Sequence, residues 1–138
     1  MIVKDLRRTG SRVSGTIYWE TAAKEPFDAF ISIGEASEEA WLGRRVSHPF
    51  LIAVLLPAMR HGEKRIRVDN EPVDPFLLEQ IRSVMALAHA WWGGEDGHYQ
   101  PVEIEAELAD HAEPKSDRVA ASFLTGGWTR SQRSELIA

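Results

Sequence analysis

The chain has no cysteine among its 138 residues. Neither a disulfide framework nor a thiolate metal site or nucleophile can therefore form within it. It also lacks an apolar run of membrane-spanning length, and charged residues stand near the N-terminus where a signal peptide needs its apolar region. We therefore expect a cytoplasmic protein with no membrane partner.

Basic charge is in the minority, since 16 Lys and Arg residues face 21 Asp and Glu residues, for a net charge of −5. The phosphate backbone of nucleic acids attracts a basic surface, so we expect no nucleic-acid partner. Basic residues do cluster at Arg7-Arg8, at Arg44-Arg45 and between Arg60 and Arg65. These clusters either gather around an anion in the fold or are spread over a solvated surface.

The sequence also lacks the usual spacings of catalytic and metal-binding residues. No serine stands in a G-x-S-x-G motif, and no two histidines have zinc-ligand spacing. We therefore assign no catalytic residue and no metal ligand. For His89 we expect a hydrogen-bonded structural role. A self-contained enzyme that uses Arg60, His61 and the face of Glu103 is the least favoured interpretation.

Alternation of apolar and polar residues predicts four strands in the first part of the chain. They cover Arg12–Trp19, Phe27–Ile33, Lys64–Val68 and Pro101–Leu108. The first two form a hairpin with a long loop, and the last presents three glutamates on the solvated face of an antiparallel sheet. In each long strand every second residue faces the core: Val13, Ile17, Trp19, then Phe27, Ala29, Ile31, Ile33, and finally Val102, Ile104, Ala106, Leu108.

Two main helices are predicted beside these strands. The first runs from His48 toward Gly62, with Ser47 or His48 as its N-cap, and Pro57 predicts a break near Leu56. One or two further helical turns are expected over residues 37–42.

The second main helix is the clearest element in the chain. It covers Phe76–Trp92, with Asp74 as N-cap, Pro75 at its start and Gly93-Gly94 at its end. Its apolar residues recur at steps of three and four and predict one core-facing stripe of Leu77, Leu78, Ile81, Val84, Met85, Ala88, Trp91 and Trp92.

An apolar run later in the chain ends in a hydroxyl residue and two glycines. After the acidic segment 109–117, residues 118–124 have the continuous apolar character of a parallel strand covered on both faces. Thr125, Gly126 and Gly127 follow directly. Glycine lets the main chain present bare N–H groups to an anion, so this turn is typical of phosphate binding.

Leu124-Thr125-Gly126-Gly127 resembles the opening of the PP-loop motif, S-G-G-x-D-S, of the ATP pyrophosphatases. That family includes asparagine synthetases, GMP synthetases and tRNA-lysidine synthetases. Thr125 stands where the motif has its first serine, and Gly126 and Gly127 match it. The motif's aspartate and second serine are absent, because Trp128, Thr129 and Arg130 follow.

The genetic code connects this departure to the motif. Tryptophan is encoded by TGG and threonine by ACN, so the frame that begins at the last base of the Trp128 codon reads GAC, which is aspartate. The codon before it becomes NTG, which permits valine, and the next permits serine if Arg130 is encoded by CGN. We hypothesise that residues 128–138 are a non-native, frameshifted tail and that an unshifted relative reads T-G-G-V-D-S-L-A-A-L. The alternative is an ordinary Thr-Gly-Gly turn and a native tail.

The sequence thus predicts an α+β fold, a small sheet of mostly antiparallel strands packed against two main helices, with a C-terminal strand that begins a separate α/β domain. Residues 1–108 form the accessory domain and 109–117 the linker. Residues 118–127 are the first strand and partial PP-loop of a missing nucleotide-binding domain, and 128–138 are the tail.

The resemblance implies a bacterial parent of the PP-loop type that binds ATP and magnesium and adenylates a carboxylate or carbonyl before a nitrogen or sulfur nucleophile attacks. Thr125, Gly126 and Gly127 are then the ATP-binding residues. We expect no cofactor and no ATP turnover in this chain itself, and we expect a homo-oligomer, such as a dimer, or a protein partner. The alternative function is a stand-alone, non-enzymatic α+β domain that binds a protein partner.

Overall fold

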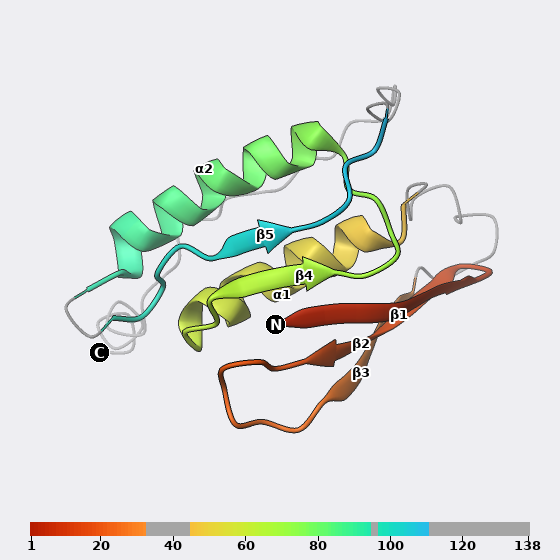
Figure 1. The fold of residues 1–138 in the computed structure, drawn as a ribbon, viewed down its shortest axis with the longest axis horizontal. Coiled ribbons are helices and arrows are strands. Elements are labelled where there is room, and N and C mark those ends of the chain that lie inside the picture. Colours follow the sequence, from red (N-terminus) through yellow and green to blue (C-terminus); the bar gives the residue numbers. More distant parts are fainter. Residues whose placement is uncertain (33–44, 95–96, 111–138) are drawn as a thin grey trace, which may run out of the picture.

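The computed structural model describes residues 1–32, 45–94 and 97–110. In this part of the chain, five strands and two helices form an α+β unit, which confirms the predicted fold class (Figure 1). The elements are β1 (Ile2–Thr9), β2 (Arg12–Tyr18), β3 (Phe27–Ser32), α1 (Ser47–Arg60), β4 (Arg65–Val68), α2 (Pro75–Trp92) and β5 (Glu103–Glu105). The helical turns expected over 37–42 and the strand expected over 118–124 lie outside the described residues, so the division into two domains stays a prediction.

The strands form one mixed sheet in the order β3-β2-β1-β4-β5. The β1–β2 and β2–β3 pairs are antiparallel and contain most of the paired residues, whereas β4 is parallel to both β1 and β5. The alternation of the glutamate-rich strand predicted an antiparallel pair. This prediction is wrong, because β5 pairs with β4 in parallel. The reason is topological: α2 connects β4 to β5, and a helical crossover joins parallel neighbours.

Strand β5 is also shorter than the predicted strand Pro101–Leu108. Its ladder with β4 ends at Glu105, and the chain pairs again further on at an isolated bridge between Val73 and Leu108. Leu108, predicted to face the core, is 58% exposed, and Ala109 is buried instead. The two-residue alternation predicts burial only as far as the ladder continues.

The sequence patterns do not predict β1, and the structure shows why. Lys4 pairs with Thr16 and Arg7 pairs with Ser14, so Asp5 and Leu6 together lie opposite Gly15 in a β-bulge. The bulge interrupts the two-residue period by which a strand is recognised. Leu6 packs against the core beside Gly15, where a Cβ atom would come within 2.6 Å of the Leu6 Cδ2 atom.

Helix α1 packs against β1 and β4, and Figure 1 shows it behind β4. It runs through Pro57 without the predicted break, and the Pro57 carbonyl accepts a hydrogen bond from the His61 N–H. Ser47 is not an N-cap, because its buried hydroxyl donates to the Pro72 carbonyl at 2.9 Å. Its buried side is large: Ser47, Phe50, Leu51, Val54, Leu55, Ala58 and Met59.

Helix α2 begins and ends as predicted. The Asp74 carboxylate accepts a hydrogen bond from the Phe76 N–H at 2.8 Å, Pro75 opens the helix, and the Gly93 N–H donates to the His89 carbonyl. The predicted stripe is only partly right. Ile81, Met85 and Ala88 are buried and Leu77 and Leu78 pack partly against the core, whereas Val84, Trp91 and Trp92 are exposed.

Candidate functional site

The predicted ATP-binding residues Thr125, Gly126 and Gly127 lie outside the described residues, so their role stays a prediction. Among the described residues, the exposed side of α2 is the most distinctive surface. One strip along this side consists of Phe76, Gln80, Val84, Leu87 and Trp91, which we call the α2 face. The four apolar side chains are 65%, 45%, 51% and 68% exposed, in chain order.

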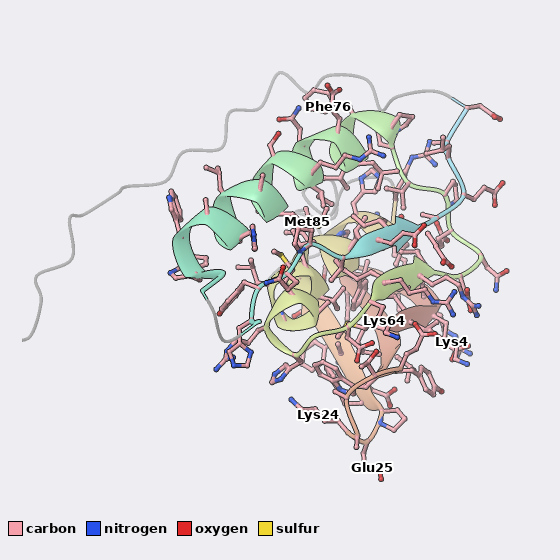
Figure 2. The ribbon with its side chains drawn as sticks, turned by 60° about the vertical axis from the view of Figure 1, so that its left-hand side comes forward. Lys4, Lys24, Glu25, Lys64, Phe76 and Met85 are labelled. Atoms are coloured by element: carbon pink, nitrogen blue, oxygen red, sulfur yellow. The ribbon has the colours of Figure 1, made fainter. Side chains whose placement is uncertain are left out.

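The α2 face is continuous because of its spacing. Its residues follow one another at steps of four, four, three and four, which places them on one side of a helix. At 1.5 Å per residue the face extends for about 22 Å along α2. Figure 2 shows Phe76 on the outer side of the helix and Met85 on the side toward the strands. None of the five residues is charged, and apolar patches of this kind mark interaction surfaces.

Aromatic rings continue the α2 face at the C-terminal end of the helix. The Trp91 and Trp92 rings meet edge to face at a centroid distance of 5.7 Å, and Trp92 lies 5.4 Å from the Tyr99 ring. His89 fixes this arrangement, since its Nδ1 atom lies 3.1 Å from the Tyr99 carbonyl oxygen. This contact confirms the hydrogen bond expected for His89, and its structural role stays a prediction.

Gly93 is required by the same close packing. A Cβ atom at Gly93 would meet the His89 ring and the His89 carbonyl oxygen at contacts that real Cβ atoms do not make. The end of α2 therefore admits only glycine at this position.

A buried carboxylate, Glu63, organises the loop that follows α1. One oxygen accepts hydrogen bonds from the Met1 ammonium at 2.6 Å and the Glu20 N–H at 3.1 Å. The other accepts from the N–H groups of Thr21 and Ala22 at 3.0 and 2.9 Å. Each oxygen of the Glu63 carboxylate therefore accepts two hydrogen bonds. A charge can be buried when its hydrogen-bonding capacity is satisfied in this way. Glu63 fixes the loop after β2 to the start of β1.

The ion pairs of Arg65 extend this network onto the sheet. Its guanidinium contacts Glu20 at 2.7 Å and Glu105 at 3.0 Å. The hydrogen bond from Arg65, with help from the Met1 ammonium, lowers the pKa of Glu20 to about 2 against the opposing effect of burial. Burial by itself would raise the pKa of Glu63, but the Ala22 N–H, the Met1 ammonium and the neighbouring N–H groups lower it.

The basic cluster between Arg60 and Arg65 does not converge on one point. Arg65 is neutralised on the sheet, whereas His61 lies at the end of α1 beside the loop between β2 and β3. The Lys24 Nζ atom is 2.9 Å from the His61 Nε2 atom and 4.5 Å from the Trp19 ring centre. Desolvation, followed by the charges of Lys24 and Arg60, lowers the pKa of His61.

The self-contained enzyme suggested by Arg60, His61 and the face of Glu103 finds no support in this geometry. Glu103 pairs in register with Arg65 on β4, while His61 contacts Lys24 and the Trp19 ring at 5.2 Å. No hydrogen bond or ion pair joins Glu103 to Arg60 or His61 within the described residues.

Within residues 1–32, 45–94 and 97–110, no group of three or more histidine, aspartate or glutamate side chains is placed to hold a metal ion. Neither helix of this part of the chain combines the length and apolar character that crossing a membrane requires. Comparisons with protein-family models, with curated proteins and with solved structures find no match to the chain. Any function must therefore be argued from the residues of this chain.

Proposed function

We propose that this chain carries the accessory domain of a PP-loop, ATP-dependent adenylating enzyme, and that the α2 face packs against the nucleotide-binding domain of the parent. The observation that carries the proposal is the sequence Thr125-Gly126-Gly127-Trp128-Thr129, because its codons specify the motif's aspartate in the neighbouring frame. The structure adds a reason for a second domain, since the α2 face is left uncovered by the described residues.

The residues at the motif match a PP-loop only in part. Backbone N–H groups at Thr125, Gly126 and Gly127 suit phosphate oxygens, which is the part of the site that glycine supplies. Trp128 and Thr129 do not replace the aspartate and the small residue before it. In the parent, ATP activates a carboxylate or carbonyl as an adenylate and releases pyrophosphate. We expect no such reaction from the 138-residue chain.

The gene provides the first test. Sequencing the DNA beyond the Gly127 codon should reveal that a single-base change opens a long frame beginning T-G-G-V-D-S. The absence of any such frame would remove the basis for an enzymatic parent.

Restoring that frame provides the second test. The long protein should catalyse ATP–pyrophosphate exchange in the presence of its substrate, and Gly126→Val should abolish the exchange because a side chain blocks the backbone from the phosphates. The 138-residue chain should have no exchange activity. Exchange by the short chain, or none by the long protein with any carboxylate supplied, counts against the proposal.

The long protein also tests the role of the α2 face. Leu87→Lys should destabilise the long protein more than the isolated residues 1–110, because only the long protein buries Leu87. Ala86→Lys is the matched control, since Ala86 is exposed on the same helix but lies outside the α2 face. Equal effects of Leu87→Lys in both proteins would show that the α2 face does not contact the second domain.

A stand-alone domain that binds a protein partner is the second candidate, and the spacing of the α2 face favours it. Two antiparallel copies of α2 would place Phe76 of each copy opposite Trp91 of the other, because these two aromatic residues stand at the two ends of the α2 face. Analytical ultracentrifugation of the 138-residue chain tests this. A concentration-dependent dimer that Leu87→Lys dissociates supports the second candidate, and a monomer at all concentrations contradicts self-association.

A further inference from the structure

The outer face of β1, β2 and β3, which points away from the helices, contains an open cavity of about 370 Å³. Its charged lining consists of Asp5, Arg7, Arg12 and Asp28. The volume is within the range of small-molecule sites. Neither helix contributes to it, so it is separate from the α2 face and from the Glu63 network.

The β-bulge in β1 builds this cavity. In a regular ladder Leu6 would lie opposite Ser14 on the outer face, and Arg7 would point to the core. The extra residue reverses this order, so Arg7 pairs with Ser14 and Leu6 packs inward. Asp5 takes the left-handed conformation, with a φ of 56°. Bulges and left-handed non-glycine residues cost free energy and are concentrated at functional sites, where they re-aim side chains.

The strand register separates the two signs of charge. Arg12 lies nearest the turn between β1 and β2, and Arg7 lies opposite Ser14, two residues further along β2. Asp5 lies at the bulge beyond Arg7, and Asp28 lies opposite Thr16, a further two residues along β2. At about 3.3 Å per residue, the Arg7 and Asp28 levels are about 7 Å apart and the Arg12 and Asp28 levels about 13 Å apart.

Neighbouring side chains hold both ends of the cavity in position. The Arg12 guanidinium lies 3.8 Å from the centre of the Phe30 ring, and the Thr16 hydroxyl donates to the Asp28 carboxylate at 2.8 Å. Neither Arg7 nor Arg12 has a carboxylate within ion-pair distance among the described residues. The two guanidinium groups therefore keep their hydrogen-bond donors for a ligand.

We propose that this cavity binds a small zwitterion, with a carboxylate at the Arg7 and Arg12 end and an ammonium group at the Asp5 and Asp28 end. Two positive and two negative side chains line it, so a bare anion or cation would meet repulsion at one end. A ligand that carries both charges, separated by a short chain, satisfies both ends at once. The Ser14 hydroxyl lies beside Arg7 in the lining and suits a polar group of the ligand. This site does not depend on the PP-loop proposal.

Titrating the isotope-labelled 138-residue chain with three probes, followed by NMR, tests the site. The probes are 6-aminohexanoate, hexanoate and hexylamine, which carry both charges, the carboxylate alone and the ammonium alone. We expect 6-aminohexanoate to shift the amide signals of residues 5–7, 12–16 and 28–30 in a saturable way. Each charge-assisted contact should contribute about tenfold or more in affinity, so the other two probes should bind at least that much more weakly.

Two variants make the test specific. Arg7→Gln should weaken the binding of 6-aminohexanoate and hexanoate but not that of hexylamine, and Asp28→Asn should weaken the binding of 6-aminohexanoate and hexylamine but not that of hexanoate. Arg67→Gln is the matched control, because Arg67 lies on β4 in an ion pair with Asp69 and outside the cavity. No saturable shift with 6-aminohexanoate, equal binding of the three probes, or an equal effect of the control would overturn the proposal.

Discussion

Helix α1 buries seven of its fourteen residues, whereas α2 buries three of eighteen. Both helices carry many apolar side chains, so composition does not explain the difference. Helix α1 packs against β1, β4 and α2, while α2 crosses over to β5, a strand of three residues. A short strand offers little surface, and the apolar side chains of α2 therefore remain on the outside. The comparison teaches that α1 completes the core of this unit and that α2 has one face in the core and a second, exposed face.

Replacing one leucine in each helix tests this comparison most strongly. Leu51 on α1 is fully buried and Leu87 on α2 is 51% exposed. Leu51→Ala should lower the free energy of unfolding by about 2–5 kcal/mol because it leaves a cavity. Leu87→Ala should change it by about 0.5 kcal/mol or less, as surface substitutions do. Urea denaturation of both variants measures the difference. A similar loss in both would mean that the α2 face is covered within the isolated chain.

Substitution of Glu63 in the loop after α1 should give the next largest loss in the free energy of unfolding. Glu63→Gln turns an amide NH2 group toward N–H donors and leaves the Met1 ammonium without this charge partner, so we expect a loss of about 1–3 kcal/mol. Glu25→Gln is the control, because Glu25 is exposed at the far end of the β2–β3 loop (Figure 2). Denaturant unfolding at neutral pH gives both values, and equal values would show that the network has no stabilising role.

The same network predicts a dependence on acid. The pKa values of Glu20 and Glu63 are lower in the folded protein than in the unfolded chain, so their contribution is fully present above the ordinary glutamate pKa. It is lost as the pH falls from about 4.5 toward the folded value of about 2 for Glu20. The Glu63→Gln variant should lose less stability across this pH window than the unsubstituted 138-residue chain.

The starts of the two helices should respond differently to a change of cap. Asp74→Ala removes the N-cap of α2 and should cost about 1 kcal/mol, and Asp74→Ser should recover most of it. Ser47 does not cap α1 but donates to the Pro72 carbonyl, so Ser47→Asp should not act as a better cap there. Thermal unfolding of the three variants checks this. Stabilisation by Ser47→Asp would contradict the assigned role of Ser47.

The smallest expected effect is at the end of α1. Because Lys24 lowers the pKa of His61, Lys24→Gln should raise that pKa, which NMR titration of the ring protons measures. A lowered pKa makes the protonated form of His61 unfavourable in the fold, so a little stability is lost as the pH falls below about 6.5. Asp28 lies on the outer face of β3, away from His61. The control variant Asp28→Asn should therefore leave the pKa of His61 unchanged. A pKa of His61 that does not respond to Lys24→Gln would contradict the contact.

The sequence predicts those parts of the fold whose signals are local. The Asp74 cap, the Pro75 start and the Gly93 end of α2 are read from adjacent residues, and the alternation over residues 12–18 and 27–32 predicts β2 and β3. Strand β1 could not be predicted, because the bulge at Asp5 and Leu6 breaks its alternation. The α2 face could not be predicted from the sequence either. Val84 and Trp91 have the spacing of core residues, and only the position of α2 in the fold leaves them exposed.

The sequence by itself determined most of the helical and extended segments and the absence of thiol chemistry, because each depends on the residues or their neighbours along the chain. The turn at Thr125, Gly126 and Gly127 stays a prediction from the sequence. Only the tertiary structure decided which side of α2 enters the core, which strands run parallel, and how Asp5, Arg7, Arg12 and Asp28 meet around one cavity. Those features depend on contacts between residues far apart in the sequence, and a local pattern carries no information about which partner fills the space beside it.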